Sequence, residues 1–204
     1  IINLSISNIV SIERAINKLG FNTLLSNDKE HIEHADFLIL PGVGSFNFAM
    51  QKIKDLNLFG PIQTHVIKNK PLLGICLGLQ LLYKKSYENN KETEGLGILD
   101  GEVIKIPNQF NNKEIKVPHI GWKNIHLLNN KNIDDKIFNN YSIKNNFYFV
   151  HSYYVNNLDD TIAYVKLEDI KIPAVIKNKN IYAFQFHPEK SGNDGLNLLL
   201  NFFK

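Results

Sequence analysis

The chain contains the stretch Leu72-Leu73-Gly74-Ile75-Cys76-Leu77-Gly78-Leu79-Gln80-Leu81-Leu82, within which the spacing of apolar residues changes. A short apolar strand at residues 72–75 runs into Gly-x-Cys-x-Gly and then into apolar residues at helical spacing. This order of strand, turn and helix is typical of a nucleophile elbow. The turn lifts its central side chain out of the sheet, so it needs small neighbours on both sides. The stretch therefore predicts a strand, a tight turn at Cys76 and a helix.

The position of Cys76 favours a chemical role. At the N-terminus of the predicted helix, the helix dipole favours the thiolate over the thiol. A lone cysteine between Ile75 and Leu77 is more often a small buried hydrophobic residue. Here the flanking glycines and the strand end indicate a nucleophile instead.

Strands and helices alternate on either side of this stretch. Short apolar strands are expected at residues 1–4, 21–25, 37–40 and 72–75. Helices are expected before Gly20, over residues 45–55 and from a first turn that contains Pro61. Such an alternation favours a mostly parallel sheet that helices cover on both faces.

The second half of the chain has a different pattern. Strands joined by short turns are expected at residues 103–106, 147–155, 162–167, 174–177 and 181–186, and a closing helix is expected over 194–203. The chain of 204 residues is long enough for one well-buried domain. The sequence thus predicts a single α/β domain over residues 1–204, with an antiparallel addition in its C-terminal half.

Composition excludes several functional classes. A net charge of +3 without Lys or Arg blocks argues against a nucleic-acid partner. Cys76 is the only cysteine, so the chain has no internal disulfide, which fits a reducing cytosol. No basic leader precedes an apolar core and no apolar run reaches about 18 residues, so we expect a cytoplasmic protein without a membrane partner. No His, Asp and Glu set has ligand-like spacing, so neither a metal nor another cofactor is expected.

A second motif is Phe184-Gln185-Phe186-His187-Pro188-Glu189-Lys190-Ser191-Gly192. A predicted strand ends at His187, and Glu189 follows two residues later, so both side chains can face one site. A nucleophilic cysteine needs a base, and the base needs an acceptor that holds its tautomer. On its own, His-Pro-Glu at a strand end is more often an ordinary turn. Together with the elbow, it predicts a catalytic triad of Cys76, His187 and Glu189.

A third motif, Leu38-Ile39-Leu40-Pro41-Gly42-Val43-Gly44-Ser45-Phe46, joins a strand to a glycine-rich turn before a helix. Acyl chemistry at Cys76 develops an oxyanion that needs preorganised N–H donors. We expect these donors from Leu77, directly after the nucleophile, and from Val43 or Gly44. A phosphate-binding loop is the alternative interpretation, but the third glycine of a dinucleotide fingerprint is missing.

These segments together resemble a known family. Pro-Gly-Val-Gly, Gly-Ile-Cys-Leu-Gly-x-Gln and Gln-Phe-His-Pro-Glu, in this order, are similar to the motifs of class I glutamine amidotransferases. Within that class, three segments resemble the glutaminase subunit of imidazole glycerol phosphate synthase: Val117-Pro118-His119-Ile120-Gly121-Trp122, Tyr148-Phe149-Val150-His151-Ser152-Tyr153 and His187-Pro188-Glu189-Lys190-Ser191. The resemblance extends over nearly the whole chain.

The resemblance implies a flavodoxin-like glutaminase domain that releases ammonia from glutamine through a glutamyl thioester. It also implies that Gly44, Gln80, Ser152 and Tyr153 hold glutamine. The implied partner is a (β/α)₈ cyclase, bound as a heterodimer, which uses the ammonia to make imidazole glycerol phosphate in histidine biosynthesis.

The same resemblance implies an interface, or a passage for ammonia, near Asn8, His119 and Trp122. The family usually opens with Asp-Tyr-Gly-x-Gly-Asn after its first strand, whereas this chain keeps only the final Asn8, which affects the expected docking. From composition alone, His119 and Trp122 fit an ordinary turn with a core indole equally well. His151, in a strand of aromatic residues, fits a hydrogen-bonded core residue better than a catalyst.

Three other interpretations remain open at this point. The nearest is a paralogous amidotransferase that supplies ammonia to a sugar-modifying partner in surface polysaccharide synthesis. A cysteine peptidase on a similar sheet is a second interpretation, which Gln80 and the His-Pro-Glu-Lys-Ser run disfavour. A phosphate-binding flavodoxin-like module without enzymatic activity is the third.

Overall fold

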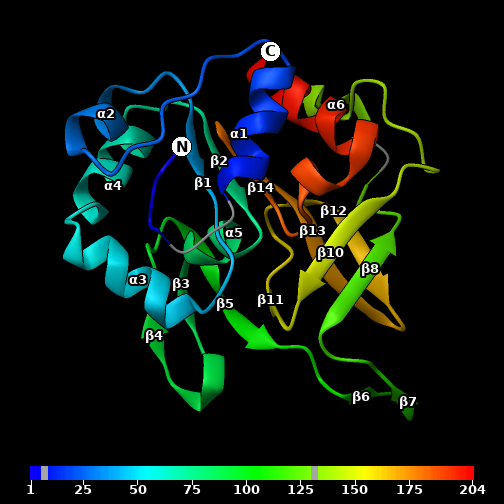
Figure 1. The fold of residues 1–204 in the computed structure, drawn as a ribbon. Helices are drawn as coiled ribbons and strands as arrows, with labels where there is room; N and C mark the ends of the chain where they lie inside the picture. Colours follow the sequence, from blue (N-terminus) through cyan, green and yellow to red (C-terminus); the bar gives the residue numbers. More distant parts are fainter. Residues whose placement is uncertain (6–8, 130–132) are drawn as a thin grey trace.

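The computed structural model describes residues 1–5, 9–129 and 133–204, and Figure 1 shows the fold. A six-stranded sheet runs through the middle of the molecule in the order β1-β2-β14-β13-β12-β9. Its strands are β1 (Leu38–Leu40), β2 (Leu72–Ile75), β14 (Ile181–Phe184), β13 (Ile170–Asn178), β12 (Thr161–Leu167) and β9 (His126–Leu127). Strands β1, β2 and β14 are parallel, and the remaining pairs are antiparallel. The predicted α/β class with an antiparallel addition is thus confirmed.

Two of the predicted N-terminal strands are reduced to a single bridge. Ile2 and Ser26 form an isolated parallel bridge instead of a ladder over residues 1–4 and 21–25. Ile2 also donates its backbone N–H to Ile39 O at 2.9 Å, so the segment still lies along the edge of β1. Leu24 and Leu25 are 59% and 38% exposed. Because these apolar side chains are not covered, little favours a longer strand there.

Helices cover both faces of the sheet, as predicted. They are α1 (Ile9–Lys18), α2 (Lys29–His34), α3 (Phe46–Asp55), α4 (Phe59–Ile67), α5 (Leu77–Leu81) and α6 (Gly192–Phe203). In Figure 1, α1 and α6 lie on one side of the sheet, and α2, α3 and α4 lie on the other. The core is divided accordingly: Ile39 of β1 packs in the cluster that contains α1 and α6 residues, whereas Leu38 and Leu40 pack in the other cluster. This alternation is the period of two that a strand imposes on its side chains.

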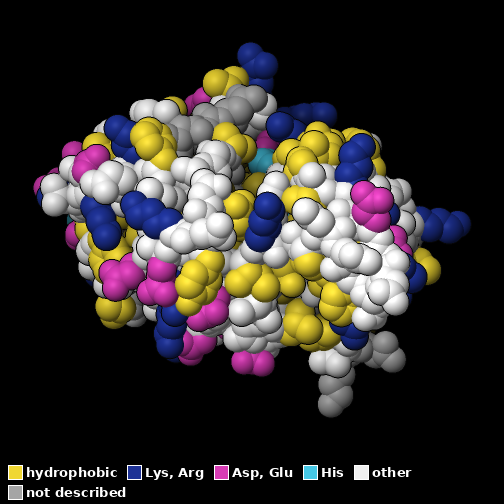
Figure 2. Space-filling view, turned by 90° about the horizontal axis from the view of Figure 1, so that it is seen from below, with side chains coloured by type: hydrophobic (Ala, Val, Ile, Leu, Met, Phe, Trp, Pro, Cys, Tyr) yellow, Lys and Arg dark blue, Asp and Glu magenta, His cyan; other side chains and the backbone are white. Residues whose placement is uncertain are grey.

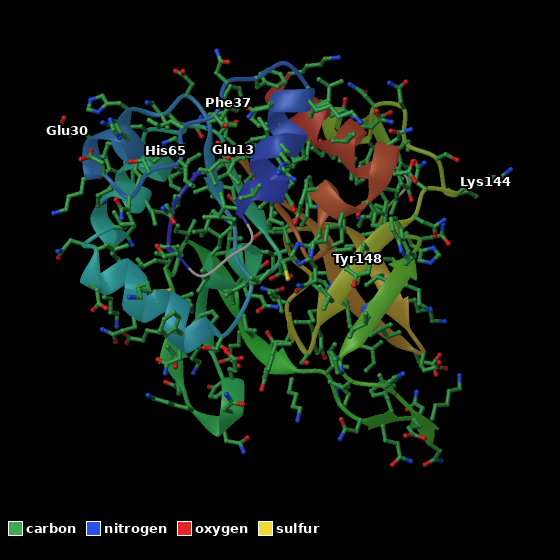
Figure 3. The ribbon with its side chains drawn as sticks, in the orientation of Figure 1. Glu13, Glu30, Phe37, His65, Lys144 and Tyr148 are labelled. Atoms are coloured by element: carbon green, nitrogen blue, oxygen red, sulfur yellow. The ribbon has the colours of Figure 1, made fainter. Side chains whose placement is uncertain are left out.

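Local signals explain several helix ends. Ser45 caps α3, since its side chain accepts a hydrogen bond from Phe48 N at 3.3 Å. Gly20, just after α1, has a φ of +89° that favours glycine. The ring of Phe37, which is labelled in Figure 3, contacts the ring of Phe203, the last residue of α6, at a centroid distance of 5.2 Å. No helix in the described part of the chain is long and apolar enough to cross a bilayer.

Smaller sheets flank the central one. A four-stranded sheet, in the order β11-β5-β3-β4, contains β11 (Tyr153–Val155), β5 (Leu99–Lys105), β3 (Tyr83–Ser86) and β4 (Thr93–Glu94). The two-stranded sheets pair β8 (His119–Lys123) with β10 (Phe147–His151), and β6 (Gln109–Phe110) with β7 (Lys113–Glu114). Short 3₁₀ turns form η1 (Glu88–Asn90), η3 (Lys136–Phe138) and η4 (Pro188–Lys190).

The predicted continuous strand over residues 147–155 is wrong in one respect, because it is split at Ser152. The part before Ser152 pairs with β8, and the part after it pairs with β5. A strand that changes partners must leave both ladders at the point of change. This break places Ser152 in the wall of the cavity that Cys76 also lines.

Candidate active site

Cys76 lies on a strained turn between β2 and α5. Its backbone has φ 54° and ψ −108°, a conformation that is rare for a residue with a side chain. Its N–H donates to Phe184 O at 2.7 Å, which anchors the turn to β14. A Cβ at Gly78 would lie 1.8 Å from Leu40 O, and a Cβ at Gly74 would lie 2.9 Å from Leu79 N. Only glycines permit these close approaches. The structure therefore has the tight turn at Cys76 that the sequence predicts.

His187 and Glu189 meet at the end of β14. The Nδ1 of His187 lies 2.8 Å from Oε1 of Glu189, and each side chain is 3% exposed. Nδ1–H therefore donates to the carboxylate, which fixes the tautomer and leaves Nε2 free to take or give a proton. Nε2 of His187 has no hydrogen-bond partner of good geometry among the described residues.

The electrostatics of His187 depend on its two acidic neighbours. Burial disfavours the charged ring, but Cys76 and Glu189 together outweigh that effect and raise the pKa of His187 to about 10. The contribution of Cys76 to this shift is larger than that of Glu189. The site therefore favours an imidazolium beside the sulfur and the carboxylate.

A cavity of about 200 Å³ opens beside Cys76. Six other predicted site residues line it: Val43, Gly44, Leu77, Gln80, Ser152 and Tyr153. They come from the β1–α3 loop, from α5 and from the break between β10 and β11. Segments that lie far apart in the sequence thus surround the sulfur on several sides.

The side-chain amide of Gln80 has a defined orientation. Its Nε2 donates to Tyr153 O at 2.9 Å and to Gln185 Oε1 at 3.1 Å. An amide nitrogen carries two N–H groups, so both are used inside the protein. If Gln80 contacts a ligand in the cavity, it does so through its carbonyl oxygen, as an acceptor.

The predicted oxyanion donors are not all directed at the cavity. Leu77 N–H donates to Gly42 O at 3.3 Å, so a backbone carbonyl uses this donor. Gly44, two residues further along, has a φ of +103°. A loop of glycines around Val43 can rotate a peptide group at low cost because Gly has no Cβ penalty at positive φ. Such a rotation would free Leu77 N–H.

Sequence reasoning missed the acidic residue of the cavity lining, Glu88 of η1. Its Oε2 accepts a hydrogen bond from Phe46 N, at the start of α3. Burial raises the pKa of Glu88, and the Phe46 bond opposes this rise. Asn89 N donates to the hydroxyl of Tyr153 at 3.2 Å, which ties η1 to β11. No motif in the sequence marks this turn, because its position depends on β3 and β5 pairing beneath it.

His119 and His151 form a second buried pair, next to the cavity. His119 Nδ1 lies 3.0 Å from His151 Nε2, and His151 Nδ1 lies 2.9 Å from Tyr153 O. Burial lowers the pKa of His119 to about 4 and that of His151 to about 3, with a further contribution to His151 from the neighbouring His119. Both rings are therefore neutral near pH 7, and His151 lines the cavity as a hydrogen-bonded residue.

The residues predicted for an interface lie in different environments. His119 is buried, whereas Ile120 and Trp122 on the same strand are 58% and 54% exposed. Trp122 contacts the ring of Tyr148, which Figure 3 labels on β10. Figure 2 shows one face of the molecule on which hydrophobic side chains form a broad band interrupted by Lys and Arg. Asn8 lies outside the described residues. No group of three or more His, Cys, Asp or Glu that could hold a metal occurs in the part of the chain that the structure describes.

Comparison with known proteins gives consistent matches. The sequence pattern of the family described as "Glutamine amidotransferase class-I" matches residues 1–204. The chain is 42% identical over 205 residues to "Imidazole glycerol phosphate synthase subunit HisH" of Lactococcus lactis, with 100% of this chain and 96% of that protein covered. It is 41% identical over 203 residues to the protein of the same name from Caldanaerobacter subterraneus, with 99% and 95% covered. The "Structure of PurLQS from Thermotoga maritima" superposes with a TM-score of 0.70 at 19% identity, covering 99% of this chain and 95% of that chain, a likeness of fold alone.

Proposed function

The chain belongs to the class I glutamine amidotransferases, and we propose that it is the glutaminase subunit of an imidazole glycerol phosphate synthase. The observation that carries this proposal is the hydrogen-bonded pair of His187 and Glu189, whose ring is influenced by Cys76, a residue that lines a cavity. The full-length similarity to HisH subunits supports the choice of pathway over a sugar-modifying one. In this role the chain converts glutamine to glutamate and ammonia, and a cyclase partner uses the ammonia.

In the first chemical step, the Cys76 sulfur attacks the side-chain amide carbon of glutamine. The C–N bond breaks, and protonated His187 gives its Nε2 proton to the departing nitrogen, so ammonia leaves and a glutamyl thioester remains. The raised pKa of His187 suits this step, because it keeps the ring protonated beside the sulfur.

The second step needs the same ring as a base. In the thioester the sulfur no longer carries charge, so the contribution of Cys76 that raises the pKa of His187 is removed. Burial then lowers the pKa of the ring, while Glu189 continues to hold its tautomer. His187 can therefore take a proton from water, which attacks the thioester carbonyl and releases glutamate.

The cavity supplies complementary groups for the rest of glutamine. Glu88 is the acidic residue of the lining, and a carboxylate there can pair with the α-ammonium group of the substrate. Gln80 offers its carbonyl oxygen, and Ser152 and Gly44 also line the cavity. We assign glutamine binding to these residues and to Tyr153.

The proposed partner surface is the exposed side of β8 with Ile120 and Trp122. Exposed large apolar side chains on one strand are typical of a surface that a partner covers. Free ammonia is mostly protonated in neutral water and then is not nucleophilic. Delivery within a closed interface between the two chains avoids this loss.

The orientation of the β1–α3 loop suggests how the partner controls hydrolysis. Leu77 N–H donates a hydrogen bond to Gly42 O, so one of the expected oxyanion donors is not available in this arrangement. We propose that the cyclase, with its ribotide ligand bound, favours the rotated loop that frees the donor. A competent state populated at about one per cent could gain at most roughly a hundredfold, and a differential affinity of about 2.7 kcal/mol would bring it to about half of the molecules, a gain of about fiftyfold.

The experiment measures glutamate production by the purified chain alone, with the cyclase, and with the cyclase and its ribotide ligand. We expect slow hydrolysis by the chain alone and a rise of up to about a hundredfold in the complete mixture. Cys76→Ala provides the background rate. Full activity in the chain alone, unchanged by either addition, would contradict the proposed control by a partner.

A further inference from the structure

The carbonyl of Tyr153 sets the direction of a buried chain of hydrogen bonds that ends at the catalytic sulfur. A backbone carbonyl oxygen can only accept. The Gln80 atom that lies 2.9 Å from it must therefore be the amide nitrogen. This fixes the orientation of Gln80 without reference to any ligand.

The same logic fixes the next amide. Gln80 Nε2 lies 3.1 Å from the Gln185 side chain, which must present its oxygen to that donor. The nitrogen of Gln185 is then directed the other way, where it lies 3.8 Å from the Sγ of Cys76. Gln185 is fully buried on the segment after β14, two residues before His187. It contacts the sulfur and is not among the residues that line the cavity.

We propose that Gln185 is a positioning residue whose amide N–H, oriented by Gln80 and Tyr153, holds the Cys76 sulfur and favours its thiolate form. The inference rests on the proposed function, in which that thiolate is the nucleophile. An N–H donor stabilises a charged acceptor more than a neutral one. A contact that favours the protonated thiol is also present. Val150 O lies 3.9 Å from Sγ and can accept a hydrogen bond only from the S–H group.

Replacing Gln185 leaves the other titratable side chains near Cys76 in place. They are His187 and Glu189 after β14, His151 from β10 and Glu88 from η1. All four are present in the wild-type chain and in a Gln185 variant alike. A difference between the two therefore reports on the amide itself.

The single cysteine makes a direct test possible. Iodoacetamide reacts with the thiolate, so the alkylation rate of the purified chain as a function of pH follows the ionisation of Cys76 alone. Gln185→Met keeps the size of the side chain but removes both amide groups. We expect the midpoint of its alkylation profile to move up by about one pH unit, with about a tenfold lower rate well below the midpoint.

A second variant guards against a failure of the first to fold. Gln185→Asn retains a buried amide that is one methylene too short to reach both Gln80 and Cys76, and its midpoint should move in the same direction by a smaller amount. The matched control is Asn201→Leu, because Asn201 is another buried amide whose Nδ2 donates to Ile137 O at 3.0 Å and to Asn139 O at 2.8 Å. This control should lower the melting temperature without moving the alkylation midpoint.

Glutamine hydrolysis gives an independent readout in the same variants. Because Gln185 is not among the residues that line the cavity, kcat should fall at neutral pH while KM changes less than about threefold. An alkylation midpoint equal to that of the wild type in a folded Gln185 variant would overturn the inference. The proposed function would survive that result, since it fails only if the wild-type chain and its partner do not hydrolyse glutamine.

Discussion

Two buried histidines, His187 next to Glu189 and His151 in the wall of the cavity, have opposite electrostatics. His187 and His151 are 2% and 6% exposed, and burial alone disfavours a charge on both rings. The pKa of His187 is nevertheless raised, because the Glu189 carboxylate and the Cys76 sulfur face it. The pKa of His151 is lowered mainly by burial and further by the neighbouring His119, and the hydrogen bond to the carbonyl of Tyr153 only partly opposes this shift. Burial therefore sets the direction of the shift at His151, whereas at His187 the acidic groups that face the ring outweigh burial.

The largest expected effect on activity comes from removing the side chain of Cys76 or that of His187. Cys76→Ala should abolish glutamine hydrolysis, and His187→Ala should lower it by several orders of magnitude. A diazo-ketone analogue of glutamine should label Cys76 alone, which mass spectrometry of the digested chain can check. An alanine variant with normal activity, or label on another residue, would contradict the assignment.

The next effect separates the charge of Glu189 from its position. Glu189→Gln keeps the ring in place but removes a group that raises the pKa of His187, and it loosens control of the tautomer. We expect kcat to fall by about 10²–10⁴-fold, which is less than the loss in His187→Ala. Because the pKa of His187 is then lower, the alkaline limb of the pH–rate profile should move to lower pH. If Glu189→Gln is the more damaged variant, the roles of base and orienting residue are wrongly assigned.

His119 and His151, whose rings are neutral near pH 7, should affect the stability of the folded chain at acidic pH. The folded pKa of His119 is about 4, below its unfolded value of about 6.5, so the unfolded chain binds more protons in between. The stability that this histidine contributes is complete above about pH 6.5 and is lost as the pH falls towards 4. The loss amounts to about 1.4 kcal/mol per pH unit for each such histidine.

Urea unfolding at several pH values between 7 and 4 measures this loss. His119→Gln should reduce the slope of unfolding free energy against pH by the share of one histidine. His126→Gln, in which an exposed ring is replaced, is the matched control and should keep the wild-type slope. A slope in His119→Gln equal to that of the wild type would mean that His119 is not held neutral in the folded chain.

The smallest expected effect concerns Ser191, which links the segment that contains His187 to β10, the strand that contains His151. Ser191 Oγ donates to His187 O at 2.6 Å and accepts from Tyr148 N at 2.9 Å, so it ties the η4 turn to β10. Ser191→Ala leaves both backbone groups without this partner, and we expect a loss of about 1–3 kcal/mol in stability. The activity should fall less than tenfold, since the triad side chains remain. Ser142→Ala, at an exposed turn, should change neither, and a Ser191→Ala variant as stable as that control would show that the link contributes little.

Much of the fold could be predicted because its signals are local. The apolar run of β2 and the glycines around Cys76 each specify a short segment through its own backbone requirements. The split at Ser152 could not be predicted in this way. The apolar pattern continues across Ser152, and only the pairing with two different strands interrupts it.

The sequence by itself determined the three motifs that contribute Cys76, His187 and the glycine loop, because a strand end, a tight turn and a helix start have short-range signatures. Only the tertiary structure decided how these groups are charged and oriented. Gln80 and Gln185 are 105 residues apart, and His119 and His151 are 32 apart, yet each pair is hydrogen-bonded. The direction of a hydrogen bond and the pKa of a ring depend on which donors and charges surround them in space. Those neighbours are brought together only when the sheet has formed.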